Sequence, residues 1–150
     1  MIIVSACLAG VQCRYNGQGF PIPEVTELVK KGQALPLCPE ILANLPTPRS
    51  SVEQCGERFL AHDGKDLTTE LIAGARIALT IAKLVGSKIA ILKSKSPTCG
   101  CGLIYDGTFS GNLIEGDGVF CAFLKDEKIK VYTEDQFQSL TLSGKKILPL

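Results

Sequence analysis

The chain of 150 residues contains no tryptophan, one methionine and one histidine, and aromatic residues make up only 6% of it. It also lacks a charge excess, because 16 basic residues oppose 15 acidic ones and leave a formal charge of +1. Proteins that bind nucleic acid usually carry a basic patch or a basic charge excess. The balance therefore predicts no nucleic acid, and no other large polyanion, as a partner.

Long hydrophobic runs are missing as well. No apolar segment approaches the roughly 20 residues that cross a bilayer, so we expect no membrane association. The first residues, MIIVSAC, lack the basic start and long apolar stretch of a signal peptide and are typical of a first strand. A cytoplasmic location is the expectation that follows.

Cysteine, in contrast, is abundant, with seven residues in the chain. The number is odd, no export signal is visible, and a hydrophobic fraction of 45% is enough to build a core without crosslinks. All three observations argue against a disulfide framework. Surplus thiols in a reducing compartment indicate metal, cluster or thiol chemistry. For Cys55, Cys101 and Cys121, a role as small buried hydrophobic residues is an equal alternative.

Short runs rich in isoleucine and valine alternate with helical patterns, which predicts one α/β domain over residues 1–150 with a mostly parallel sheet flanked by helices. We expect strands at 2–4, 34–37, 88–92 and 129–132, and a further strand at 146–148. The stretches 39–65 and 100–118 show no clear periodicity. Loops of this length usually serve function, and the second is rich in glycine.

The clearest helix pattern covers residues 68–85, where apolar residues recur with a period near 3.6. Asp66 or Thr68 can cap its start, and Gly86 stands where a terminating glycine belongs. Shorter helices are expected at 25–31 and 119–125. Another should follow Thr133, whose spacing to Gln136 fits a capping box.

Three cysteines share one context, because each follows a predicted strand. Cys7 comes after the first strand, Cys38 directly after the second, and Cys99 ends the loop after the third. Loops at the carboxyl ends of parallel strands gather at one edge of a sheet and form its ligand crevice. We therefore expect these three thiols to converge.

Three convergent thiolates suit a cubane iron–sulfur cluster in which one iron has no protein ligand. That iron would be a Lewis acid with a free position, and a soft atom such as sulfur would occupy it. A structural zinc would want four ligands, commonly in paired Cys-x₂₋₄-Cys motifs, and the chain has none. Lys93 and Lys95 lie near Cys99 in sequence and either offset the thiolate charge or are solvated.

Six segments together resemble the thiouracil desulfidase family, long defined only as a domain of unknown function. They are VSACLAG at 4–10, CRYNG at 13–17, LCPE at 37–40, LPTPR at 45–49, SPTCG at 96–100 and IYDGTFSG at 104–111. The resemblance spans nearly the whole chain in order. Asn16 stands where the family usually has aspartate, and Ala43 and Asn44 stand where it usually has two glycines. Both departures are expected in the pocket wall.

The resemblance implies a Rossmann-like domain that carries a [4Fe–4S] cluster and desulfurates a small thiolated nucleobase or a related thioamide. Its cluster ligands would be Cys7, Cys38 and Cys99. Its acid–base residues would be Glu40 and Ser96. Binding of the thiocarbonyl sulfur to iron would make the carbon electrophilic, and Glu40 would deprotonate the attacking water.

Two other functions remain open from the sequence. One is cluster-free sulfur transfer, in which Cys13 or Cys101 forms a persulfide. The other is a non-enzymatic module that binds sulfide or a small ligand. Cys13 also stands close enough to Cys7 in sequence to replace it as a ligand.

Overall fold

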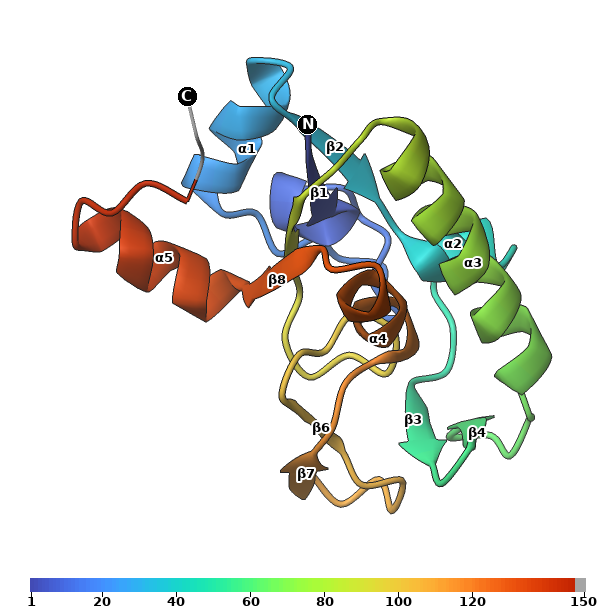
Figure 1. Cartoon of the computed structure of the whole chain (residues 1–150). Helices are drawn as coiled ribbons and strands as arrows, with labels where there is room; N and C mark the ends of the chain where they lie inside the picture. Colours follow the sequence, from blue (N-terminus) through green and yellow to red (C-terminus); the bar gives the residue numbers. More distant parts are fainter. Residues whose placement is uncertain (148–150) are drawn as a thin grey trace.

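The structure is a computed structural model, and it describes residues 1–147. Four parallel strands form one sheet in the order β2-β1-β5-β8 (Figure 1). Their bounds are Ile2–Ser5 for β1, Ala34–Leu37 for β2, Ile89–Leu92 for β5 and Lys130–Thr133 for β8. The predicted α/β class with a parallel sheet is therefore confirmed.

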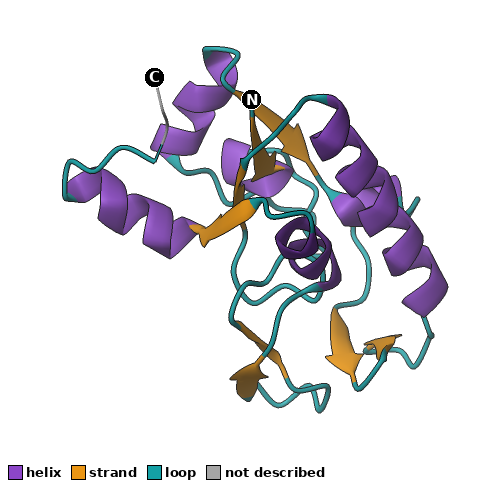
Figure 2. Cartoon of the chain, viewed as in Figure 1, coloured by secondary structure: helices purple, strands orange, loops and turns teal. Residues whose placement is uncertain are grey.

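Helices cover both faces of this sheet (Figure 2). They are the short 3₁₀ helix η1 at Ala6–Ala9, α1 at Pro23–Lys30, α2 at Pro39–Leu42, α3 at Thr68–Leu84, α4 at Val119–Asp126 and α5 at Glu134–Leu142. Successive side chains of a strand point to opposite faces. Ile2 accordingly packs with Val25 of α1, whereas Ile3 packs with Ala78 of α3 and Phe120 of α4.

Two antiparallel hairpins lie beyond the carboxyl edge of the sheet (Figure 1). The first pairs β3, Val52–Cys55, with β4, Arg58–Ala61, and the second pairs β6, Leu103–Tyr105, with β7, Leu113–Glu115. The expectation that 39–65 and 100–118 lack regular structure was therefore wrong. Strands of three or four residues are too short to show a period, so turn residues dominate the pattern of both stretches.

The four predicted helices form within two residues of their predicted bounds, whereas α2 was not predicted. Both hydrogen bonds of the predicted capping box at Thr133 and Gln136 are present. The start of α3 is different, because Leu67 is its N-cap residue and makes no side-chain cap. Asp66 instead accepts a hydrogen bond from the Thr68 amide at 3.0 Å.

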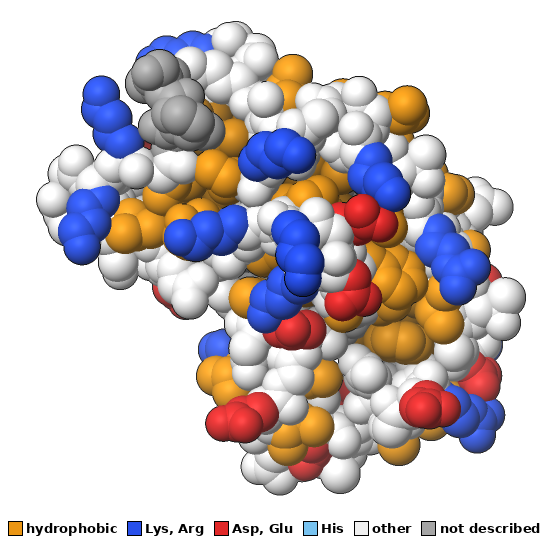
Figure 3. Space-filling model, viewed as in Figure 1, with side chains coloured by type: hydrophobic (Ala, Val, Ile, Leu, Met, Phe, Trp, Pro, Cys, Tyr) orange, Lys and Arg blue, Asp and Glu red, His pale blue; other side chains and the backbone are white. Residues whose placement is uncertain are grey.

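The strand expected at 146–148 does not form at residues 146 and 147, and residue 148 lies outside the described part of the chain. None of the helices in residues 1–147 has the length and apolar character needed to cross a membrane. On the face shown in Figure 3, basic side chains lie mainly over the upper part and acidic ones mainly over the centre and lower part, and neither sign covers the whole face. This distribution agrees with the balanced net charge.

Candidate active site

A cavity of about 620 Å³ opens at the carboxyl edge of the sheet. Its walls come from the segments that follow β1, β2 and β5, and from both hairpins. Since β2 and β5 flank β1 on opposite sides, the connections after β1 and β5 leave in opposite directions, and the cavity lies where the strand order reverses. Open parallel sheets bind their ligands at this point.

All five residues predicted for the site line this one cavity. Cys7 lies in η1, Cys38 directly follows β2, and Cys99 lies in the loop after β5. Glu40 is in the first turn of α2, two residues beyond Cys38, and Ser96 lies three residues before Cys99. Residues from three distant parts of the sequence therefore meet on one wall.

Cys13 is a fourth thiol on the same cavity. A hydrogen bond from Cys38 lowers the pKa of Cys13, but its hydrogen bond to Cys7 and its burial outweigh this effect and raise the pKa to about 11. Burial is the main cause that raises the pKa of Cys99 to about 12. Arg49 opposes this rise only weakly at Cys13, and both thiols would lose their protons on binding a metal.

The carboxylate of Glu40 is held from both sides. Arg49 donates from Nε to Oε1 at 3.2 Å, and the Thr98 hydroxyl donates to Oε2 at 3.1 Å. Only 6% of the Arg49 side chain and 15% of the Glu40 side chain is exposed, so water screens this ion pair weakly. Arg49 also donates to the carbonyl of Cys13 at 2.9 Å. The arginine thus ties the acid to the segment that bears the fourth thiol.

Ser96 extends this network toward Cys99. Its hydroxyl lies 2.9 Å from the Thr98 hydroxyl and accepts the amides of Thr98 and Cys99, both at 3.1 Å. Thr98 is only 1% exposed. A continuous chain of hydrogen bonds therefore joins Ser96, Thr98, Glu40 and Arg49. Sequence reasoning missed the part played by Thr98, because its position shows only after the loop has folded.

The backbone of α2 comes unusually close to α3 at Gly74. A Cβ atom at Gly74 would lie 2.2 Å from the carbonyl oxygen of Pro39, so only glycine fits there. This close approach fixes α2 against the long helix. It thereby positions Cys38 and Glu40, which flank Pro39.

The hairpins form the outer wall of the cavity and carry residues to which the sequence analysis gave no role in the site. Buried Glu53 of β3 accepts the amides of Gly107 and Phe109 at 3.1 and 3.2 Å, which fastens the second hairpin to the first. The rings of His62 and Phe109 meet edge to face, with centroids 5.0 Å apart. Together with Tyr105, these rings line the cavity. They offer flat apolar surfaces to a planar ligand.

Lys93 brings a positive charge to the cavity wall and is paired with buried Glu134 of α5. Its Nζ lies 2.8 Å from Glu134 Oε1, and the Ser94 amide donates to Oε2 at 2.7 Å. Burial alone would raise the pKa of Glu134, but the hydrogen bonds from Lys93 and Ser94 outweigh it and hold the pKa below its ordinary value. Lys93 is therefore anchored rather than freely solvated.

Substituting Glu134→Gln should destabilise the protein by about 2 kcal/mol, because it leaves a half-buried ammonium without its counter-ion. The lowered folded-state pKa means that the stabilising contribution is complete above the ordinary value of 4.5 and is lost as pH falls through the folded value. Urea unfolding at pH 7 and pH 3 tests this expectation. The variant should differ from wild type less at pH 3, and an equal difference at both pH values would contradict it.

The two departures from the family pattern do not line the cavity. The side chain of Asn16 accepts the amide of Gln18 at 3.1 Å and stabilises a turn, as an aspartate can also do. Asn44 has a φ of 63°, a left-handed conformation that glycine adopts without strain and asparagine tolerates. The expectation that these positions change the pocket wall was wrong.

Several thiols, a clamped carboxylate and two hydroxyls at the carboxyl edge of a parallel sheet define a cysteine-rich α/β enzyme with a small-molecule cavity. The chain belongs to the 2-thiouracil desulfurase family, whose model matches residues 2–136. An uncharacterized Bacillus subtilis (strain 168) protein, YbbK, is 37% identical in an alignment of 150 positions that covers 93% of this chain and 99% of that protein. The solved structure of TudS, a [4Fe-4S]-dependent thiouracil desulfidase, superposes with a TM-score of 0.88 at 42% identity and covers 95% of each chain.

Proposed function

We propose that this chain removes sulfur from small thiocarbonyl compounds such as 2-thiouracil, using a [4Fe–4S] cluster bound by Cys7, Cys38 and Cys99. The observation that carries the proposal is the meeting of these thiols with Glu40 and Ser96 in one cavity. Full-length similarity to a [4Fe-4S]-dependent thiouracil desulfidase supports the same activity.

The residues present fit such a cluster. Thiolates are the donors that iron–sulfur clusters prefer, and the cavity offers them from three separate loops. A volume of about 620 Å³ exceeds what a single ion requires and leaves space for a substrate beside the cluster. Arg49 and Lys93 lie on the same walls and balance the acids Glu40 and Glu134, so these acids add no net negative charge to that of the thiolates.

Cys7 is the proposed third ligand, and Cys13 is its hydrogen-bonding neighbour. The choice follows the family resemblance, in which the cysteine of the VSACLAG segment is the ligand. Cys7 belongs to the short helix that directly continues β1, so the sheet itself fixes its position. Because a cubane has four irons, an open iron requires that Cys13 does not bind the cluster in addition to the other three cysteines.

When bound, a cluster with one iron free of protein ligands supplies a Lewis acid that polarises the C=S bond of the substrate. Glu40 then acts as the general base that takes a proton from the attacking water. Arg49 keeps the carboxylate oriented, and Thr98 leaves lone pairs of Oε2 available to the water. Water supplies the oxygen of the carbonyl product, and the sulfur leaves as sulfide with the protons of that water. The reaction therefore needs no external oxidant or reductant.

Ser96 is proposed to bind the substrate ring or the water, since its hydroxyl lies on the cavity and is held by Thr98. Since Thr98 donates its proton to Glu40, Ser96 is the donor to Thr98, and this chain of hydrogen bonds orients the carboxylate. His62, Tyr105 and Phe109 are proposed to hold the planar base, because aromatic rings stack on nucleobases.

The test compares turnover of 2-thiouracil to uracil by anaerobically reconstituted protein and by protein stripped of metal with a chelator. Only the reconstituted protein should form uracil and sulfide. Activity of the stripped protein, abolished by alkylation, would instead support cluster-free persulfide transfer. Cluster loading without turnover of any thiolated nucleobase would support a binding module.

A further inference from the structure

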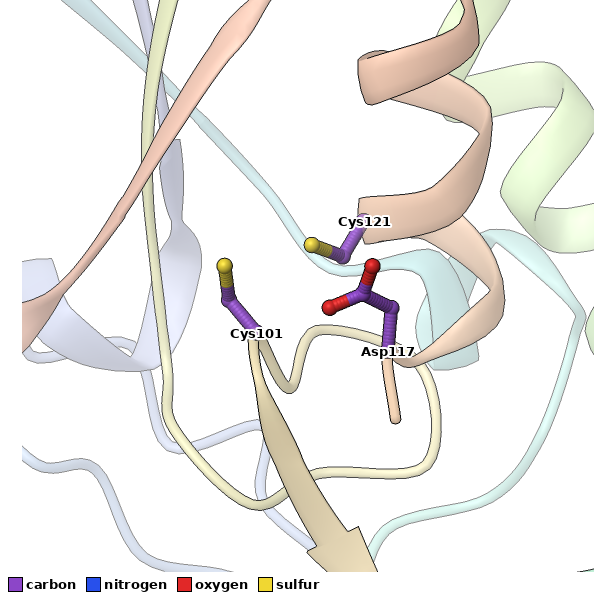
Figure 4. A group of neighbouring side chains, drawn as sticks. All are labelled: Cys101, Asp117 and Cys121. Carbon is purple, nitrogen blue, oxygen red and sulfur yellow. The ribbon is translucent and has the colours of Figure 1, made fainter. Parts of the chain in front are cut away.

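A second group of thiols lies outside the cavity. Cys101 follows the loop that bears Cys99, Asp117 lies two residues before α4, and Cys121 is in the first turn of that helix (Figure 4). The two Sγ atoms and a carboxylate oxygen of Asp117 lie within 4.8 Å of one another. None of the three residues lines the cavity described above. They form a second group of possible metal ligands, with two soft sulfur donors and one hard oxygen donor.

The size of this group suits a single metal ion. Zinc binds sulfur at about 2.3 Å and carboxylate oxygen at about 2.0–2.2 Å, so its ligand atoms lie about 3.5–3.8 Å apart in a tetrahedron. The observed spread of at most 4.8 Å is therefore within about 1 Å of a bound arrangement. Small side-chain rotations can close that difference. Cys101 and Asp117 are partly exposed while Cys121 is buried, so an ion and a water ligand can enter from solvent.

Asp117 is already oriented by its surroundings. The amide of Gly102 donates to Oδ1 at 2.8 Å, and Gly102 has a φ of 86° that places this amide toward the carboxylate. Hydrogen bonds of this kind hold the carboxylate ligands of metal sites in place. Lys125 Nζ lies 3.0 and 2.9 Å from the two carboxylate oxygens. Its ammonium supplies the positive charge that a bound cation would bring.

We propose that Cys101, Asp117 and Cys121 bind one thiophilic divalent cation of the zinc class, with water as the fourth ligand. The ion displaces the Lys125 ammonium from Asp117. It connects the loop after β5 to the start of α4, where the Phe120 amide already donates to the Thr98 carbonyl at 2.9 Å. A Cβ atom at Gly118 would lie 2.5 Å from that same carbonyl group, so loop and helix are in direct backbone contact.

The bound ion has a structural role, because it joins the start of α4 to the loop after β5, whose residues at the cavity are already held by the hydrogen bonds of Ser96, Thr98 and Glu40. The proposed zinc site does not depend on the proposed desulfuration, because its ligands are not the cysteines proposed to hold the iron–sulfur cluster. Loss of this site should therefore leave the iron content of the cavity unchanged.

The experiment equilibrates cluster-loaded protein with Zn²⁺, removes unbound metal and measures zinc and iron per chain. One zinc per chain is expected beside full iron content. The double variant Cys101→Ser/Cys121→Ser should lose the zinc and keep the iron. Competition with a chromogenic chelator should show that Asp117→Asn weakens binding at least about tenfold, and that Lys125→Met strengthens it by removing the competing charge.

Zinc content near zero in wild type, or unchanged zinc in the double variant, would overturn the proposal. So would weaker binding by Lys125→Met. A mass 2 Da below that of the reduced chain, abolished in the double variant, would show a disulfide and also overturn it. If the cluster does not load, the same titration in a chain with Cys7, Cys13, Cys38 and Cys99 replaced by serine decides the question. The proposed function can therefore be refuted while the zinc site is supported. The zinc site can likewise be refuted while the proposed function is supported.

Discussion

Replacing Cys7, Cys38 or Cys99 singly with serine should remove the cluster and reduce 2-thiouracil turnover by at least about a thousandfold. Lewis-acid polarisation of a reacting group is worth several kcal/mol of barrier, which corresponds to about that factor in rate. Serine offers a hard oxygen donor, which holds the iron of a cluster less well than a soft thiolate does. Iron content and visible absorbance of anaerobically reconstituted variants measure the first effect, and a uracil assay measures the second.

Cys13→Ser and Cys55→Ser are the matched controls. Cys13 lies on the same cavity, so its variant separates a ligand from a neighbour, whereas Cys55 is exposed at the end of β3. Both should keep at least most of the iron and the activity. If Cys13→Ser loses the cluster and Cys7→Ser keeps it, Cys13 is the ligand and Cys7 is its neighbour.

Glu40→Gln should lower turnover by about 10²–10⁴-fold while iron content stays at the wild-type level, because that range is typical of general-base catalysis. The amide keeps the size and most hydrogen bonds of the carboxylate but cannot take a proton from water. Comparison of kcat with iron content separates the chemical step from cluster loss. A Glu40→Gln enzyme with wild-type kcat would exclude Glu40 as the base.

Thr98→Val tests the hydrogen bonds that hold Glu40, and its expected effect on turnover is smaller than that of Glu40→Gln. Valine nearly matches threonine in shape, so the buried site stays filled while the hydrogen bonds to Glu40 and Ser96 are lost. We expect an intermediate loss of kcat and a shifted pH–rate profile, because the environment of the carboxylate changes. Thr98→Ser should restore both. A profile unchanged in Thr98→Val would show that this hydroxyl only fills space.

The sheet and most helices follow from the sequence because their signals are local. Lys88–Leu92 is an apolar β-type run with turn residues on both sides, and residues 68–85 keep one apolar face for more than four turns. Strand ends then bring distant cysteines to one edge, since parallel order is itself predictable from alternating strand and helix patterns.

The outer wall and the second thiol group were not predictable in this way. In the sequence, Glu53 is one acidic residue within a polar stretch. Only the pairing of β3 with β4 shows that it is buried against the Gly107 loop. Cys101 and Cys121 are 20 residues apart and belong to no recognised metal motif. Their proximity depends on how the loop after β5 packs on α4, which is a tertiary contact without a periodic signal.

The central claim is that three cysteines suffice to hold a catalytic cluster with one iron left open. The most direct measurement uses a chain in which Cys13, Cys55, Cys101 and Cys121 are all replaced by serine, so that only Cys7, Cys38 and Cys99 remain. Anaerobic reconstitution should give about four irons per chain and conversion of 2-thiouracil to uracil. A correctly folded variant, judged by its circular dichroism, that binds no iron or binds iron without turnover would contradict the account.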